Sequence, residues 1–136
     1  RYPKEVTAGS VNDDMVLNVD FAPTFLEYAD APVPDAMQGH SIQPLLARKR
    51  PEDWRTSMYY QYYEFPGAHS VRKHYGVRTE RYKLIHYYDS LDEWELFDIE
   101  KDPHELRSVY GHPDYAQIQA ELEQEIKRLR KELAVS

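Results

Sequence analysis

The sequence contains no cysteine, and its five glycines are not clustered among the 136 residues. Without cysteine, the chain forms no disulfide, no thiolate zinc site and no cysteine nucleophile. Dispersed glycines exclude a glycine-rich phosphate loop. No apolar run approaches about 18 residues and the mean hydropathy is −0.80, so no membrane-spanning helix is predicted.

Positive charge is also scarce. The chain has 17 basic and 24 acidic side chains, a net charge of −7, and basic residues are interleaved with acids. This balance argues against nucleic acids as partners. The length suits one modest domain that can bury a real core without metal or disulfide. Because the chain begins at Arg1 and shows no leader pattern, we expect a mature or excised piece of a longer product.

The first 50 residues predict short helices only, because five of the nine prolines lie there. A helix is expected over residues 18–29, with Pro23 in its first turn, where proline is tolerated. A second helical turn is expected over residues 42–47. The basic stretch before Pro51 reads as a linker, so we place an organisational boundary near residue 50.

Beyond residue 50 the pattern changes to a period of two, which predicts strands. One strand is expected over residues 58–65, with Tyr59 on one face and Tyr60 on the other. Residues 75–79 and 82–88 flank a tight turn and predict a hairpin. The remaining strand is expected over residues 94–99, which completes a sheet of about four antiparallel strands.

The last segment carries one apolar face at helical spacing. Acidic residues occupy its early turns and basic residues its late turns, as the helix dipole favours. The repeat is too short to favour a coiled coil, so we predict one helix packed on one face of an α+β sheet. The apolar positions are Tyr115, Ile118, Leu122, Ile126, Leu129 and Leu133.

Two patterns resemble metal sites but do not fit one. The acids Asp98, Glu100 and Asp102 alternate like calcium ligands, yet the glycine and glutamate that such a loop requires are absent, so the segment reads as a strand end entering a turn. His74 and His86 lie on opposite arms of the hairpin and could approach each other, but no zinc-binding spacing is present.

A cationic stretch at residues 69–74 (HSVRKH) is the best candidate for binding chemistry. Arginine binds sulfate, phosphate or carboxylate through two parallel hydrogen bonds, and histidine adds another donor. A solvated loop with ordinary charge balance explains the same residues. No GxSxG or SxxK pattern accompanies the serines, so no serine hydrolase is predicted.

The order of several segments resembles the type I sulfatases, and the resemblance covers nearly the whole chain. Residues 19–29 (VDFAPTFLEYA) and 37–46 (MQGHSIQPLL) resemble the end of the large catalytic α/β domain of that family. Residues 75–85 (YGVRTERYKLI) and 94–105 (WELFDIEKDPHE) resemble its C-terminal subdomain. Within the family, residues 69–88 look most like the N-acetylglucosamine-6-sulfatase and mucin-desulfating groups.

The resemblance implies a division into residues 1–50, the end of the catalytic domain and linker, and 51–136, the C-terminal subdomain. It also implies calcium and a formylglycine in the parent enzyme, made from a C/S-x-P-x-R motif that this chain lacks. No catalytic or metal residue is therefore expected here. His69, Arg72 and His74 become candidate substrate contacts, and Arg78 and Lys83 remain structural.

We therefore expect the C-terminal part of a sulfatase acting on sulfated sugars or aryl sulfates, inactive when isolated. Its expected partner is the rest of the catalytic domain, and without it the first 50 residues should expose apolar surface and self-associate. Family habit implies export to the periplasm or cell exterior. Two alternatives stay open: a stand-alone carbohydrate- or anion-binding module, and a purely structural subdomain.

Overall fold

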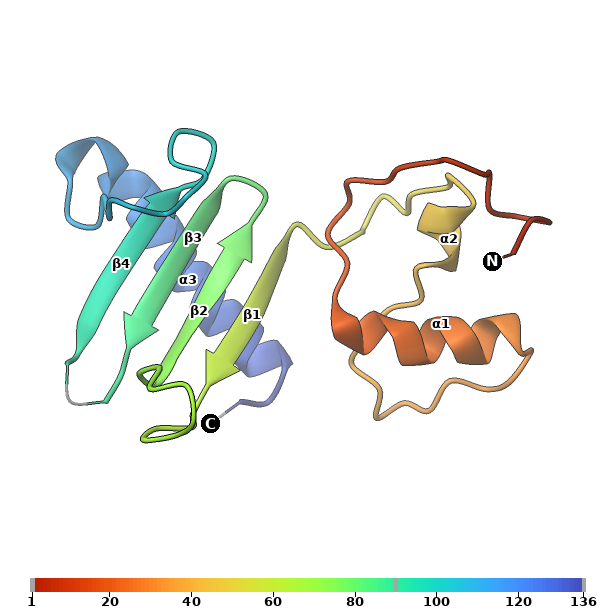
Figure 1. Cartoon of the computed structure of the whole chain (residues 1–136), viewed down its shortest axis with the longest axis horizontal. Coiled ribbons are helices and arrows are strands. Elements are labelled where there is room, and N and C mark those ends of the chain that lie inside the picture. The colour runs from red at the N-terminus through yellow and green to blue at the C-terminus, as the bar shows by residue number, and fades with distance from the viewer. Residues whose placement is uncertain (1, 90, 136) are drawn as a thin grey trace. The chain divides into compact units, whose positions relative to one another are not determined.

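The computed structural model describes residues 2–89 and 91–135 and divides the chain into two compact units, residues 1–55 (unit 1) and 56–136 (unit 2). Figure 1 labels their helices and strands. Among the described residues, no helix is both long enough and apolar enough to cross a membrane.

Unit 1 is built from short helices. A 3-10 turn over Asn18–Asp20 leads into α1 (Phe21–Tyr28), and α2 spans Gln43–Leu46. Both helices were predicted, and Pro23 lies in the first turn of α1 as expected.

A buried charge pair organises unit 1. The side chain of Asp20 is fully buried. It accepts hydrogen bonds from both terminal nitrogens of the Arg55 guanidinium and from the backbone N–H groups of Leu17 and His40. Although burial opposes ionisation, these hydrogen bonds together hold the pKa of Asp20 below its usual value. A carboxylate satisfied in this way joins three separate stretches of the chain.

Unit 2 is a four-stranded antiparallel sheet in the order β1-β2-β3-β4. The strands are β1 (Ser57–Tyr62), β2 (His74–Thr79), β3 (Tyr82–Tyr87) and β4 (Glu93–Asp98). The predicted hairpin and alternation are confirmed. The first strand ends at Tyr62 rather than at residue 65, because Tyr62 pairs with His74, the first residue of β2, and the chain turns away beyond that pair.

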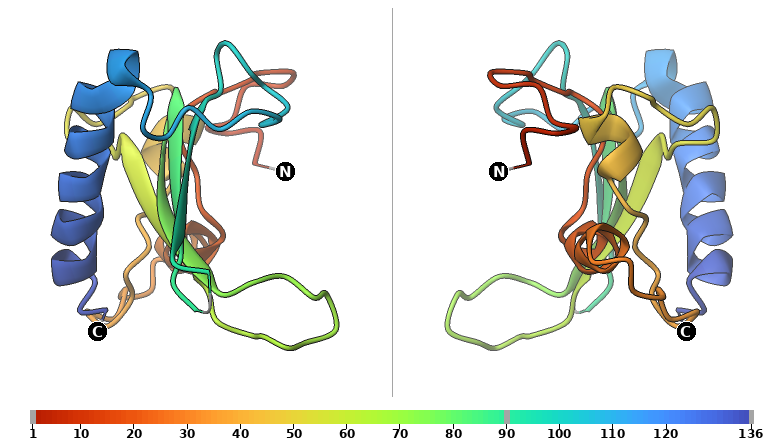
Figure 2. Two further views of the ribbon diagram at one scale, coloured as in Figure 1. Left: turned by 90° about the vertical axis from the view of Figure 1, so that its left-hand side faces the viewer. Right: turned by 90° about the vertical axis from the view of Figure 1, so that its right-hand side faces the viewer.

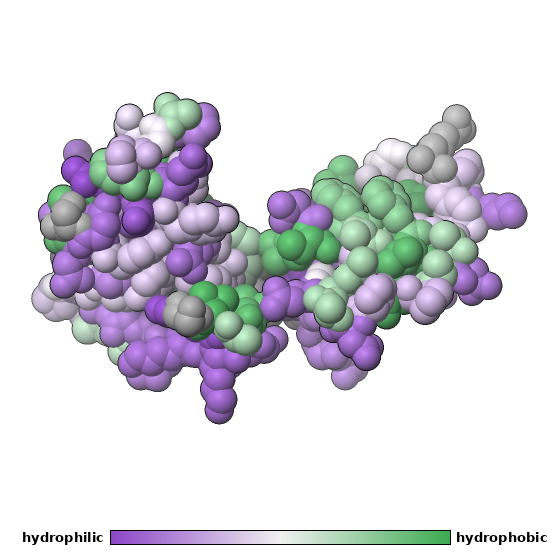
Figure 3. All heavy atoms as spheres, turned by 90° about the horizontal axis from the view of Figure 1, so that it is seen from below, coloured by the Kyte–Doolittle hydropathy of each residue, from purple (hydrophilic) through white to green (hydrophobic). Residues whose placement is uncertain are grey.

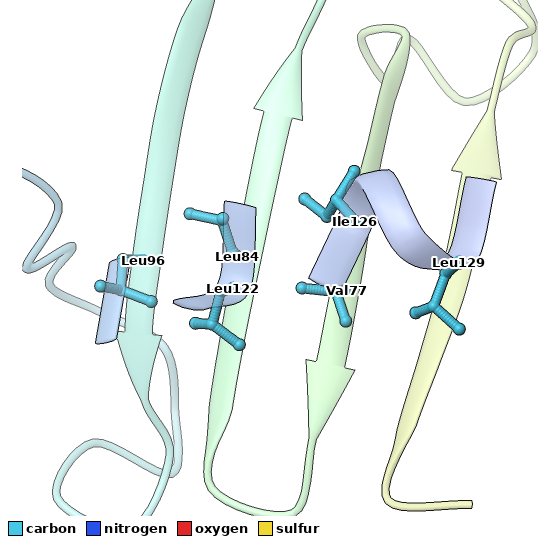
Figure 4. Packing of buried hydrophobic residues seen from close by; sticks show 6 residues of the cluster. All are labelled: Val77, Leu84, Leu96, Leu122, Ile126 and Leu129. Atoms are coloured by element: carbon cyan, nitrogen blue, oxygen red, sulfur yellow. The ribbon is translucent and has the colours of Figure 1, made fainter. Parts of the chain in front are cut away.

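The helix α3 (Ala116–Glu132) follows a 3-10 turn over Pro113–Tyr115 and covers one face of the sheet, as predicted. Figure 4 shows its apolar side chains against those of the strands. Tyr75, Tyr115 and Ile118 pack around this cluster. Its buried members are Val77, Leu84, Leu96, Leu122, Ile126 and Leu129.

The opposite face of the sheet carries no helix within the described part of unit 2. Figure 2 shows that residues 63–73, between β1 and β2, extend outward on this side, opposite α3. The strand register places alternate residues there, and we call this surface the open face. It includes Tyr60, Tyr62, His74, Gly76, Ile85, Tyr87 and Glu95.

Candidate functional site

The predicted cationic stretch lies at the end of the loop over residues 63–73 and runs into β2. His69 is exposed, whereas Arg72 and His74 are half-buried. Ser70 adopts a left-handed backbone conformation with φ 51°, and its N–H donates to the carbonyl of Gly67. The loop therefore presents His69 to solvent and returns Arg72 and His74 to the start of the sheet.

Arg72 is held at the base of this loop by two contacts. Its guanidinium carbon lies 4.5 Å from the centre of the Phe65 ring, a cation–π geometry. Its Nη1 atom lies 3.8 Å from Oδ2 of Asp89, which follows β3. Arg72 therefore connects the start of the loop, at Phe65, with the residues that follow β3, at Asp89.

His74 lies among three tyrosine rings on the open face, and we call this arrangement the tyrosine cage. The imidazole centre is 5.6 Å from the ring centre of Tyr87, 5.8 Å from that of Tyr62 and 5.9 Å from that of Tyr60. The Tyr62 ring stacks on it, with an interplanar angle of 24°. His74 Nδ1 lies 2.7 Å from the carbonyl oxygen of Arg72. These contacts fix both the position and the rotation of the imidazole.

The tyrosine hydroxyls of the cage are largely buried. Burial, and then the nearby Glu95 carboxylate, to which its hydroxyl donates, raise the pKa of Tyr87 to about 12. Burial also raises the pKa of Tyr60 well above its usual value. The hydroxyls of Tyr60 and Tyr62 are buried without a hydrogen-bond partner among the described residues. Buried hydroxyls are normally satisfied, so these two oxygens are exceptions among the described residues.

The alternation in β1 predicts Tyr59 and Tyr60 on opposite faces, but no sequence pattern indicates a cage around His74. Its formation depends on the pairing of Tyr62 with His74 and of His74 with Tyr87, which places the three side chains in one row. The alternating tyrosines of β1 were the available signal, but they could not give the register.

The suggestion that His74 and His86 could approach each other is wrong. His86 pairs with Tyr75, whereas His74 pairs with Tyr87, so the two imidazoles lie on opposite faces of the sheet. His86 instead stacks on Trp94 at 4.1 Å and contacts Tyr75. Across residues 2–89 and 91–135, no three histidine or acidic side chains gather as metal ligands.

The acids that resemble a calcium loop have structural contacts. Asp98 ends β4, is 2% exposed and accepts a two-point hydrogen bond from Arg81. Arg81 also contacts Glu100, and Leu106 donates its backbone N–H to Asp102. The segment is therefore a strand end entering a turn, as predicted.

The chain belongs to the N-sulphoglucosamine sulphohydrolase, C-terminal family, whose model matches residues 1–132. It is 48% identical over 134 residues to an N-acetylglucosamine-6-O-sulfatase of Bacteroides thetaiotaomicron, covering 97% of this chain and 24% of that protein. The resemblance to sulfatases seen in the sequence is thus confirmed.

Solved structures agree with this assignment. A protein solved with its substrate D-glucosamine-2-N,6-O-disulfate shares 46% identity and a TM-score of 0.95, over 98% of this chain and 28% of that one. A phosphonate monoester hydrolase from Silicibacter pomeroyi shares 25% identity and a TM-score of 0.78, over 93% of this chain and 27% of that one. The chain spans about a quarter of the length of these relatives.

Proposed function

We propose that this chain is the C-terminal part of a sulfatase that hydrolyses sulfate esters of sulfated sugars. The observation that carries the proposal is the 48% identity to an N-acetylglucosamine-6-O-sulfatase over nearly the whole chain. The similar structure bound to a 6-O-sulfated glucosamine supports a sugar substrate rather than a simple aryl sulfate. The proposed activity belongs to the complete protein, of which this chain supplies one part.

In this proposal, residues 1–50 complete the catalytic α/β domain and residues 51–136 form the C-terminal subdomain. The partner of unit 1 is the rest of the catalytic domain, because the apolar side of α1 faces outward. Phe21 is 49% exposed and Phe25 68% exposed, with their rings stacked at 6.5 Å, and Val19 is 50% exposed. Figure 3 shows the apolar surface that unit 1 presents on the side in view. Such a surface is typical of an interface.

The proposed contribution of unit 2 is a wall of the substrate cleft formed by His69, Arg72 and His74. The cationic stretch over residues 69–74 supplies arginine, lysine and two imidazoles beside aromatic rings, which suit a sulfated sugar. Arg72 is half-buried and held by Phe65 and Asp89, so it is preorganised rather than freely rotating. Preorganisation favours binding because less side-chain freedom is lost.

The parent enzyme is proposed to use calcium and a formylglycine, as sulfatases do. The residues of this chain do not fit either group. There is no C/S-x-P-x-R motif in the sequence, and no metal-ligating cluster is found across the described residues. The chemistry of bond cleavage is therefore assigned to the remainder of the protein, and the isolated chain is expected to release no sulfate.

Sulfate release tests the proposal. The complete protein is incubated with N-acetylglucosamine-6-sulfate and, in parallel, with p-nitrophenyl sulfate, and free sulfate is measured. We expect turnover of the sugar by the complete protein and none by the 136-residue chain. Absence of sulfate release from any sulfated glucosamine by a folded, complete protein would contradict the proposal, as would turnover by the isolated chain.

A second candidate function is a stand-alone carbohydrate- or anion-binding module, and the cationic stretch over residues 69–74 is the observation that favours it. Calorimetry of the isolated chain with glucosamine-6-sulfate and with glucosamine separates the two. Appreciable, sulfate-dependent affinity favours the module, because a site completed by another part of the protein binds poorly when divided. A purely structural role of unit 2 is tested by replacing His69, Arg72 and His74 with alanine in the complete protein. Unchanged turnover would leave only that structural role.

A further inference from the structure

The orientation of the His74 ring restricts which of its atoms a ligand can reach. A carbonyl oxygen only accepts hydrogen bonds, so the 2.7 Å contact with the Arg72 carbonyl requires a proton on His74 Nδ1. In a neutral imidazole the other nitrogen then carries a lone pair. Nε2 of His74 is therefore an acceptor, and Nδ1 is occupied by the protein itself.

The tyrosine cage prevents the ring from exchanging its two nitrogens. Tyr62 stacks on one side of the imidazole, and Tyr60 meets it at an interplanar angle of 69°. Turning the ring over would break the bond to Arg72 and leave the carbonyl unpaired in a half-buried place. The cage thus preserves one orientation of His74.

We propose that His74 is a specificity residue that accepts a hydrogen bond from a sugar hydroxyl through Nε2, rather than binding sulfate. This inference rests on the proposed function and divides the site by chemistry. Sulfate oxygens are acceptors and gain nothing from an acceptor nitrogen, so the cations of the loop bind the sulfate. The hydroxyls of Tyr60 and Tyr62 are fully buried and do not reach a ligand, whereas His74 is only half-buried.

His86 provides a contrast within the same sheet. Its Nε2 lies 2.8 Å from Oδ1 of Asp92, and its Nδ1 lies 2.8 Å from the hydroxyl of Tyr75. A carboxylate accepts, so His86 carries its proton on Nε2, the opposite tautomer to His74. The two histidines therefore serve as mutual references in a tautomer measurement.

Binding of deoxy sugars to the complete protein tests the proposal. The probes are glucosamine-6-sulfate and its 3-deoxy and 4-deoxy analogues, and the variants are His74→Gln and His74→Asn. Glutamine places a polar group near the Nε2 position, whereas asparagine places one near Nδ1. His112→Asn, at an exposed site before α3, is the control.

We expect one deoxy analogue to bind about tenfold more weakly than the parent sugar to the wild-type protein, the effect of one lost hydrogen bond. The same loss is expected with His74→Gln and His112→Asn, and no loss with His74→Asn. Equal losses in the wild type and His74→Asn would overturn the proposal. The proposal would also be overturned if His74→Asn lost affinity for the deoxy analogue as the wild type does while His74→Gln lost none. That result would assign His74 to the Arg72 carbonyl alone.

A second measurement needs no variant to remain folded. Long-range proton–nitrogen NMR of the wild-type protein, at a pH where both rings are neutral, reports the tautomer of each histidine. We expect a proton on Nδ1 of His74 and on Nε2 of His86, and a proton on Nε2 of His74 would overturn the inference. If the complete protein releases sulfate but neither deoxy analogue loses affinity in a way that depends on His74, only this inference fails. Without sulfate release, the proposed function fails first.

Discussion

Replacing Asp98 by asparagine should destabilise unit 2 much more than its place at the end of a strand suggests. The carboxylate is 2% exposed and accepts two hydrogen bonds from Arg81 and one from the hydroxyl of Tyr115. Asparagine is nearly the same size but carries no charge. The substitution therefore removes the charge and turns one of the two acceptor oxygens that face Arg81 into a donor.

The pKa of Asp98 gives the magnitude. The bond from Arg81 chiefly lowers this pKa from 3.8 to about 2, against the opposing effect of burial. At 1.36 kcal/mol per unit, the ionised carboxylate stabilises the fold by about 2 kcal/mol. Because the folded-state pKa lies below the unfolded-state value, this contribution is fully present above pH 3.8 and is lost as the pH falls towards 2.

Urea unfolding followed by circular dichroism measures the effect. At pH 7 we expect Asp98→Asn to reduce the free energy of unfolding by about 2 kcal/mol, and the difference from the wild type to shrink near pH 2. The matched control is Glu100→Gln, because Glu100 also contacts Arg81 at 2.9 Å but is 69% exposed. Exposed pairs contribute little. Equal stability of the two variants at pH 7 would refute this reasoning.

Three other substitutions probe packing and surface. Leu84→Ala removes a fully buried side chain and should lower the free energy of unfolding by about 2–5 kcal/mol in a urea titration, whereas a loss below that range would mean the cluster repacks. Gly76→Ala places a Cβ 2.3 Å from the Leu84 carbonyl and 2.6 Å from the Tyr60 hydroxyl, so we expect loss of the cooperative unfolding transition, and a wild-type midpoint would contradict this close approach. Phe25→Ser should reduce self-association of the isolated chain in sedimentation, and unchanged association would exclude the exposed side of α1 as its cause.

The sheet and α3 could be predicted because their patterns are local. The hairpin follows from its tight turn, and the three-and-four spacing of α3 reflects one buried face; the structure confirms both. In β3 and β4 adjacent residues are buried on both faces of the sheet. The boundary of β1 was set by its partner strand, and no pattern within β1 shows where pairing with β2 stops.

The site depended on contacts between distant residues and was less accessible. The stretch over residues 69–74 was predicted from its charge, but the cage around His74 arises from strand register. The pair formed by Asp20 and Arg55 joins residues 35 positions apart and left no periodic signal. In α1, the apolar residues Phe21 and Phe25 are exposed, and the buried residues are Pro23 and Thr24, which follow the buried Asp20.

We propose that this chain completes a sulfatase whose nucleophile is encoded elsewhere in the same protein. The most direct measurement is to sequence the source gene upstream of the codon for Arg1. We expect an in-frame C/S-x-P-x-R motif in the translated sequence. A start codon immediately before Arg1, with no such motif in frame, would contradict it and favour the binding module instead.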